Sequence, residues 1–200
     1  MLDLAHRRLV YGRRIQVLAR HLAELLPRHA SVLDVGAGDG LLARRVMDAR
    51  PDLLIRGVDV MTRPRSHIPV ELFDGITLPF ADREFDAVMM VDVLHHAAEQ
   101  ERLLEEMARV SKRVVLIKDH VVRGAFAWRT LVFMDWVGNA RHGVSLPYSY
   151  WTADQWARAY ARLRLHVAEQ RERLGLYPWP ASLLFERDLH FIAVLERSTT

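Results

Sequence analysis

The chain consists of apolar segments of strand length that alternate with segments of helical periodicity. Apolar runs typical of buried strands occur at residues 31–35, 54–60, 69–73, 84–91 and 113–118. Helical spacing of apolar residues occurs at 41–50 and 99–110, and an amphipathic helix at 3–26 precedes the first strand. Strands that are apolar throughout and alternate with helices indicate an α/β fold, with a parallel sheet covered by helices on both faces.

Two regions depart from this alternation. The segment MTRPRSHI between the second and third strands has one proline, is followed directly by a second at Pro69, and is too short for a helix, so we expect a short, irregular crossover there. After residue 120 the pattern predicts helices at about 123–140 and 152–161, and two late strands near 163–170 and 188–196. We find no interdomain linker, and expect residues 1–200 to form a single domain.

Composition excludes several kinds of chemistry. The chain has no cysteine, which excludes disulfides, thiolate metal sites and cysteine nucleophiles. No run approaches the ~18 apolar residues that a membrane span needs, and the N-terminus lacks the apolar region of a signal peptide, so we expect a cytoplasmic protein. The net charge of +3 is too small to require a nucleic-acid partner.

The stretch VLDVGAGDG at residues 32–40 is a strand followed by glycines at Gly36, Gly38 and Gly40. No lysine follows, as a Walker A loop would need, and the spacing is not the GxGxxG of dinucleotide sites. Asp34 precedes the turn; its carboxylate would repel a pyrophosphate but attract an ammonium or sulfonium group. The following helix can direct its free N–H groups towards a carboxylate, and a ligand with all these groups is S-adenosylmethionine.

At this point the sequence resembles the class I methyltransferases, in the small-molecule branch (methyltransferase type 11) that includes the ubiquinone and menaquinone biosynthetic enzymes. The resemblance runs through VLDVGAGDG, RGVDV, FDGITLPFADREFD, VDVLHH and RVVLIKDH. It implies a Rossmann-like, mostly parallel sheet of seven strands with the last strand antiparallel. It also implies an N-terminal helical lid (1–30), a cofactor-binding core (31–120), and acceptor-side helices and last strands (121–200).

The resemblance assigns cofactor contacts to positions that match its motifs. Asp34, Gly36, Ala37 and Gly38 would line the methionine moiety. Asp59, with Val60 beside it, would accept the ribose hydroxyls; the alternative is a helix cap or loop acid. Asp74 and Gly75 would face the adenine, unless Asp74 only forms a turn. Val91 and Asp92 would border the sulfonium, and Tyr11 and Arg14 are candidate lid contacts.

Candidate catalytic residues follow the fourth and fifth predicted strands. These are His95 and His96 after the fourth, and Asp119 and His120 after the fifth. We expect His96 or His120 to be a general base if the acceptor must lose a proton, because imidazole titrates near neutral pH. The alternative is that these side chains cap helices or bind the loop backbone. Metal-dependent phenol methyltransferases have an Asp-Asn pair where this chain has Asp119-His120, so we expect no metal.

The second half of the chain predicts the acceptor. Thirteen of the 17 aromatic residues lie after position 119, and some of them would line an apolar pocket. Asp135, Asn139 and His142 share one helical face, either as a polar wall of that pocket or as an exposed stripe. The expected acceptor is a small aromatic or hydrophobic molecule, methylated on oxygen, nitrogen or carbon. The aromatic residues expected to contribute to the pocket are Phe126, Trp128, Phe133, Trp136, Tyr148, Tyr150, Trp151, Tyr177 and Trp179.

Three alternatives stay open. The acceptor could be a lipid-linked quinone precursor, reached at a membrane surface through the basic face of the N-terminal helix. The chain could also bind the cofactor without catalysing a reaction. Methylation of nucleic acids is not expected, because DVLH stands where base-amino methyltransferases have a [DNS]PP[YFW] turn and no cysteine is present for C5 methylation. The sequence does not determine the oligomeric state.

Overall fold

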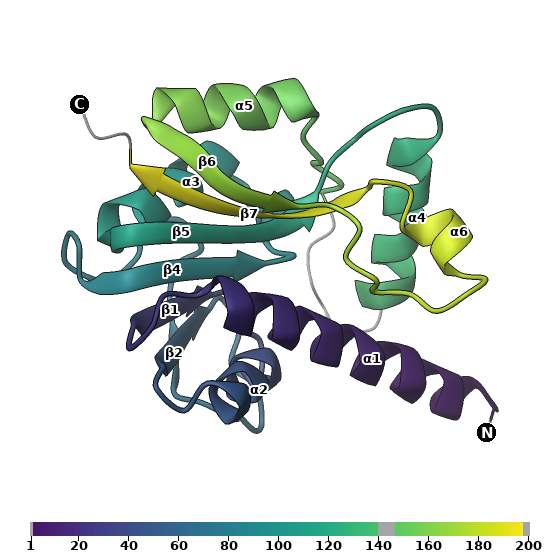
Figure 1. Cartoon of the computed structure of the whole chain (residues 1–200), viewed down its shortest axis with the longest axis horizontal. Coiled ribbons are helices and arrows are strands. Elements are labelled where there is room, and N and C mark those ends of the chain that lie inside the picture. The colour runs from purple at the N-terminus through teal and green to yellow at the C-terminus, as the bar shows by residue number, and fades with distance from the viewer. Residues whose placement is uncertain (1, 140–146, 198–200) are drawn as a thin grey trace.

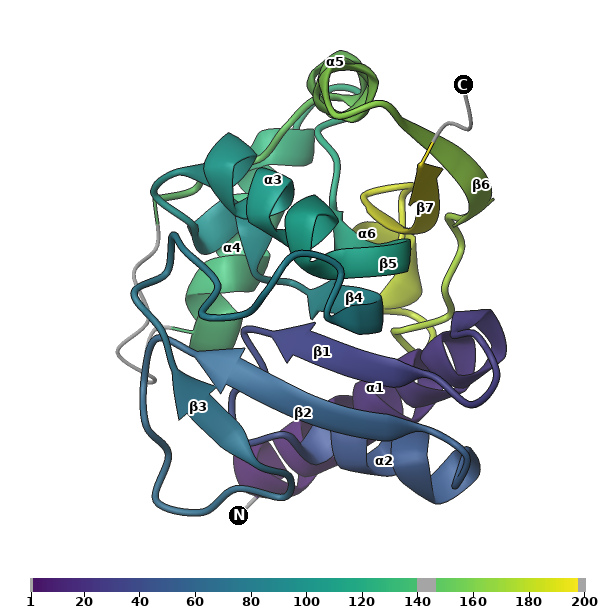
Figure 2. The same ribbon diagram turned by 90° about the vertical axis from the view of Figure 1, so that its left-hand side faces the viewer.

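The computed structural model describes residues 2–139 and 147–197, which form a seven-stranded sheet with helices packed against it (Figures 1 and 2). The strand order is β3-β2-β1-β4-β5-β7-β6, and every neighbouring pair is parallel except β5–β7 and β6–β7. The strands are β1 (Ser31–Val35), β2 (Leu54–Asp59), β3 (Val70–Leu72), β4 (Phe85–Val91), β5 (Ser111–His120), β6 (Leu165–Arg171) and β7 (His190–Arg197).

Helices cover both faces of the sheet, as predicted (Figure 2). One apolar core joins α1 (Leu2–Leu25) and α2 (Leu41–Ala49) to one face. A second core joins α3 (Gln100–Val110) and α5 (Ala153–Arg162) to the other. The apolar strands are therefore buried on both sides, which explains why their sequences do not alternate with polar residues.

The predicted architecture is confirmed, including the antiparallel last strand and the irregular connection between β2 and β3. Two short elements were not predicted: the 3₁₀ helix η1 (Leu94–His96) and α6 (Ser182–Phe185). Helix α4 (Ala127–Asn139) begins four residues later than expected, because Gly124 and Phe126 have positive φ angles (80° and 62°), outside the right-handed helical region.

The parallel strands bring the candidate residues to one edge of the sheet. The carboxyl ends of β1, β2, β4 and β5 lie side by side, and residues 36–40, 59–61, 92–96 and 118–120 follow or end these strands. In sheets of this kind, ligands bind outside the carboxyl ends. Among the described residues, no helix is long and apolar enough to cross a membrane.

Candidate functional site

The glycine turn after β1 is held close to β2 and leaves space beside it. The amides of Gly36 and Ala37 donate to the carbonyl oxygen of Val58, at 2.8 and 3.0 Å. A Cβ atom at Gly36 would lie 2.4 Å from Val93 Cγ2, so a larger residue cannot pack there. A Cβ atom placed on Gly38 (φ 61°) would have no atom of the described residues within 4 Å of it. The turn therefore packs tightly at Gly36, and at Gly38 it exposes backbone that a ligand can approach closely.

Two buried carboxyl groups lie beside this turn. Asp59, at the end of β2, accepts the amides of Gly38 (2.8 Å) and Met61 (2.9 Å), and so connects the turn to β2. Asp34, at 4% exposure, has its pKa raised to about 7 by burial and by the negative charge of Asp59. Neither acid forms an ion pair in the part of the chain that the structure describes, and two neighbouring acids of this kind favour a cationic ligand over a phosphorylated one.

The residues predicted to face the adenine and ribose lie on loops at the same edge of the sheet. Val60 is exposed next to Asp59, and its Cγ1 atom lies 3.1 Å from the position that a Cβ atom would take on Gly75. Asp74 accepts the amides of Ile76 and Thr77, at 2.8 and 2.7 Å. Asp74 thus stabilises a turn, which was the alternative role given to it above. Its contact with adenine stays a prediction.

Asp92 lies directly after Val91 of β4 and is part of a buried ion network. It accepts Arg14 Nη2 of α1 at 2.5 Å and binds Lys118 Nζ at the end of β5. Burial opposes ionisation of Asp92, but Lys118 and Arg14 outweigh it and hold the pKa of this carboxyl well below its usual range. Arg14 thus lies over the strand ends, where a lid contact was predicted. Asp92 is thus paired with two cations, whereas Asp34 and Asp59 have no cationic partner among the described residues and can attract a cation.

Tyr11, the other lid candidate, is one helical turn from Arg14 and is exposed. Burial of part of its side chain and the charge of Asp39 raise the pKa of Tyr11, and its contact with the cofactor stays a prediction.

His95 and Asp119, two of the predicted catalytic residues, are in direct contact. His95 Nδ1 lies 2.6 Å from Asp119 Oδ1, and His95 Nε2 lies 3.4 Å from Asp135 Oδ2. Burial favours the neutral imidazole, but the two carboxylates outweigh it and raise the pKa of His95 to about 10. With no other ligand bound, His95 is therefore protonated at neutral pH and cannot act as a general base there.

His120 is also buried but is neutral. Burial and the charge of Lys118 lower the pKa of His120 to about 4, although its Nδ1 atom lies 3.3 Å from Asp119 Oδ1. His96 is partly buried, and its ring stacks at an angle on His95 with centroids 4.0 Å apart. The structure thus brings all four predicted catalytic residues together, and a general base among them stays a prediction.

Several residues of this cluster were not predicted from the sequence. Lys118 is fully buried, and His190 of β7 contacts it, with His190 Nδ1 3.2 Å from Lys118 Nζ. Tyr150 was predicted only as one of nine aromatic candidates, yet its ring stacks on His95 and its hydroxyl donates to Asp135. The one signal in the sequence for Lys118 is a single charged residue that ends the apolar run VVLI.

Asp135 belongs to the buried cluster rather than to an exposed stripe. The other two members of its predicted helical face cannot be compared, since the side chain of Asn139 and all of His142 lie outside the described residues. Most of the predicted pocket aromatics on α4 and near α6 are exposed. These are Phe126, Trp128, Phe133, Trp136 and Trp179.

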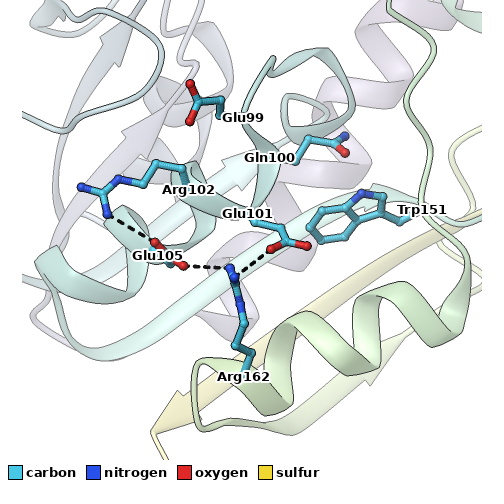
Figure 3. A pocket seen from close by; sticks show the side chains of 7 residues that line it. All are labelled: Glu99, Gln100, Glu101, Arg102, Glu105, Trp151 and Arg162. Carbon is cyan, nitrogen blue, oxygen red and sulfur yellow. Dashed lines mark hydrogen bonds and ion pairs between the residues drawn. The ribbon is translucent and has the colours of Figure 1, made fainter.

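A hollow of ≈ 430 Å³ between α3 and α5 is shown in Figure 3. Its walls carry charges that are already paired: Arg162 with Glu101 and Glu105, at 2.8 and 2.7 Å, and Arg102 with Glu105. Neither Asp34 nor Asp59 lines this hollow, and none of the buried histidines does. We therefore assign the functional site to the strand ends and not to this hollow.

The residues at the strand ends fit S-adenosylmethionine. The buried acids Asp34 and Asp59 suit its cationic groups and hydroxyls, and the space beside Gly38 admits close approach. Arg14 Nε is buried without a hydrogen-bond partner among the described residues, so this donor is available for the carboxylate of a methionine moiety.

Comparison with known proteins matches part of the chain to methyltransferases. Residues 33–116 match the family model described as a methyltransferase domain. A demethylmenaquinone methyltransferase of Corynebacterium urealyticum is 36% identical over 84 residues, covering 40% of this chain and 36% of the relative. The 27-O-demethylrifamycin SV methyltransferase of Amycolatopsis mediterranei is 28% identical over 108 residues, covering 46% of this chain and 39% of that enzyme.

The chain thus spans well under half the length of these two curated relatives. Among solved structures, the S-adenosylmethionine-dependent methyltransferase of Mesorhizobium loti has the same fold, with a TM-score of 0.64 and 16% identity over 89% of this chain and 96% of that one. Residues 33–116 thus match a methyltransferase domain, and the fold of the chain is that of the class I S-adenosylmethionine-dependent methyltransferases.

Proposed function

We propose that the chain transfers a methyl group from S-adenosylmethionine to a small aromatic or hydrophobic acceptor. The observation that carries this proposal is the pair of buried acids, Asp34 and Asp59, beside the open backbone of Gly38. The cofactor would supply the methyl group on a sulfonium ion. The relatives named above act, by their names, on demethylmenaquinone and on 27-O-demethylrifamycin SV, which supports a small-molecule acceptor here.

The residues around the strand ends have distinct roles in this proposal. Asp34 binds the cationic end of the methionine moiety, Arg14 its carboxylate, and Asp59 the ribose hydroxyls. The acceptor binds near η1 and β5, beside the buried cluster of His95, His120 and Tyr150. His120 is neutral there, and together with His96 it is the proposed base for an acceptor that must lose a proton. An acceptor without such a proton needs only positioning on the methyl axis.

Asp59→Ala tests the cofactor assignment. Isothermal titration with S-adenosylhomocysteine should show binding weaker by about 1–3 kcal/mol, because the ribose hydroxyls lose their acceptor and Gly38 loses its anchor. Asp48→Ala removes the same charge from the exposed surface of α2 and should leave affinity unchanged. Unchanged affinity in Asp59→Ala would show that this acid does not contact the cofactor.

Turnover is tested separately, with labelled S-adenosylmethionine and a panel of phenols, quinols and amines. Transfer of label to any of them supports the proposed activity. Tight cofactor binding without transfer to any acceptor of these classes would favour the alternative of a cofactor-binding protein that does not catalyse methylation.

A second candidate, an acceptor presented at a membrane surface, is favoured by an exposed apolar surface on α4 and α6. These two helices lie side by side (Figure 1), and the rings of Phe133 and Phe185 are 6.4 Å apart. An exposed surface rich in tryptophan and leucine is typical of proteins that dock at lipid interfaces. Its members are Phe133, Trp136, Val137, Trp179, Leu183 and Leu184.

The membrane candidate predicts that Trp136→Ser with Leu184→Ser weakens binding to phosphatidylglycerol-containing vesicles by about 30-fold in a cosedimentation assay, because each exposed side chain contributes about 1 kcal/mol when half buried in lipid. Val167→Ser, on the exposed edge strand β6, is the control. Arg13→Gln with Arg20→Gln tests the basic face of α1 without deleting a helix whose Leu18 and Leu22 are in the core. Equal sedimentation of all variants would remove the membrane candidate.

A further inference from the structure

His95, His96 and Asp135 form a compact group of side chains that can ligate a metal. One potential ligand atom from each lies within 4.8 Å of the other two. Two of them come from η1 and one from α4, so the fold brings together residues 40 positions apart in the sequence. His95 and Asp135 are buried, and His96 is partly buried.

The orientation of His95 indicates a ligand between it and Asp135. Its Nδ1 atom is engaged by Asp119 at 2.6 Å, which directs Nε2 to the opposite side. The side chain is only 3% exposed, and Nε2 has no hydrogen-bond partner among the described residues. Nε2 faces Asp135 at ion-pair distance but without a hydrogen bond, so a ligand between the two would make a contact that the polypeptide alone does not supply.

The separation of His95 Nε2 and Asp135 Oδ2 is 3.4 Å, without hydrogen-bonding geometry. Two ligands bound tetrahedrally to zinc at about 2.0–2.1 Å lie about 3.3–3.4 Å apart. A single ion between Nε2 and Oδ2 therefore fits the observed spacing without movement of either side chain.

The surrounding residues orient the group as metal ligands are commonly oriented. Asp119 accepts from the non-ligating nitrogen of His95, and Tyr150 donates to the carboxylate of Asp135. A second grouping, His95 with Asp119 and His120, would have to use nitrogens that are already engaged by Asp119. In the first grouping, Asp135 Oδ2 also accepts from the Tyr150 hydroxyl, but a carboxylate oxygen has a second lone pair for an ion, and His95 Nε2 makes no hydrogen bond among the described residues.

We infer that His95, His96 and Asp135 bind one divalent transition-metal ion of the zinc class, leaving a further coordination position open. Imidazole and carboxylate ligands suit such ions. The expectation that the chain has no metal site rested on the Asp119-His120 positions; the residues inferred here are different ones, and Asp119 acts only by orienting His95. Metal binding at these residues does not depend on the proposed methyl transfer.

The test is metal binding by the full chain after removal of metals with a chelator. Isothermal titration with Zn²⁺ should show one equivalent bound, and Co²⁺ should give the intense visible absorption of a tetrahedral complex. Asp135→Asn and His95→Gln should each weaken binding by at least about 100-fold, and Asp119→Asn by about 10- to 100-fold.

His166→Gln is the matched control, because His166 lies exposed on β6 at 3.9 Å from Glu196 and could bind metal adventitiously. Circular dichroism and thermal melting establish that each variant is folded. If His95→Gln does not fold, Asp135→Asn and His96→Gln carry the test. The inference is overturned if no stoichiometric binding occurs, or if the folded ligand variants bind Zn²⁺ as tightly as the unaltered chain.

Discussion

Replacing Asp34 with Asn is expected to weaken binding of S-adenosylmethionine while making the ligand-free protein more stable at neutral pH. Asp34 is buried, and burial together with Asp59 raises its pKa to about 7. The carboxylate form of Asp34 is thus unfavourable in the site without ligand. A cationic ligand binds this same carboxylate form. Loss of a charge-assisted contact of about 1.5–3 kcal/mol corresponds to affinity lower by about ten- to 100-fold.

The pH dependence of stability follows from the direction in which this pKa moves on folding. A carboxyl with a raised pKa binds its proton more tightly in the folded chain, so its contribution to the free energy of unfolding falls as pH rises from about 4 to about 7. A tenfold difference in proton affinity between the folded and unfolded chain corresponds to about 1.4 kcal/mol, so Asp34→Asn should recover up to about 4 kcal/mol above pH 7.

Denaturant unfolding between pH 4 and 8 measures this gain, and Asp48→Asn on the exposed surface of α2 controls for the change in net charge. Titration calorimetry between pH 5.5 and 7.5 should show cofactor affinity rising with pH in the unaltered chain, because the carboxylate form binds the cation. Asp34→Asn should abolish that rise. Affinity independent of pH in the unaltered chain would contradict the role of Asp34.

The second large effect is expected at the buried ion network. Asp92→Asn should lower the free energy of unfolding by about 3–5 kcal/mol, because it leaves the fully buried ammonium group of Lys118 without its carboxylate. Asparagine is the appropriate replacement, since residue 92 has a φ of 57°, which asparagine tolerates better than most residues.

Urea unfolding of Asp92→Asn, alone and combined with Lys118→Met, measures the effect. The double variant should recover part of the loss, because the fully buried ammonium group is gone, while Arg14, which is partly exposed, still lacks its carboxylate. Asp82→Asn removes one partner of the exposed pair with Arg109 and should cost less than about 1 kcal/mol. A loss of that size in Asp92→Asn, or a double variant no more stable than the single one, would show that the network does not stabilise the fold.

The fold could be predicted from the sequence because its signals are local. Apolar runs such as AVMMV indicate strands buried on both faces, and Pro51 after α2 marks the end of a helix. Helix α5 likewise begins with a capping box between Thr152 and Gln155. The late start of α4 was not predictable, since the positive φ angle of Phe126 leaves no trace in its residue type.

The residues of the site could be predicted only where they belong to a sequence motif. Asp34, Gly38 and Asp59 stand at motif positions, and the structure places them together. The contact of Arg14 with Asp92 spans 78 residues, and that of Lys118 with His190 spans 72, so neither leaves a local pattern. Asp135 could be named from its helical face, but its contact with His95 depends on how α4 packs.

The position of β7 has a consequence for the biosynthesis of this chain. Because β7 lies between β5 and β6, neither pairing exists until residues 190–197 have left the ribosome. Until then, β5 is an open edge, and the ammonium group of Lys118 lacks its His190 contact. Nascent chains that end before β7 should therefore be trapped by chaperones and cut by proteases, and cofactor should protect only the longer ones.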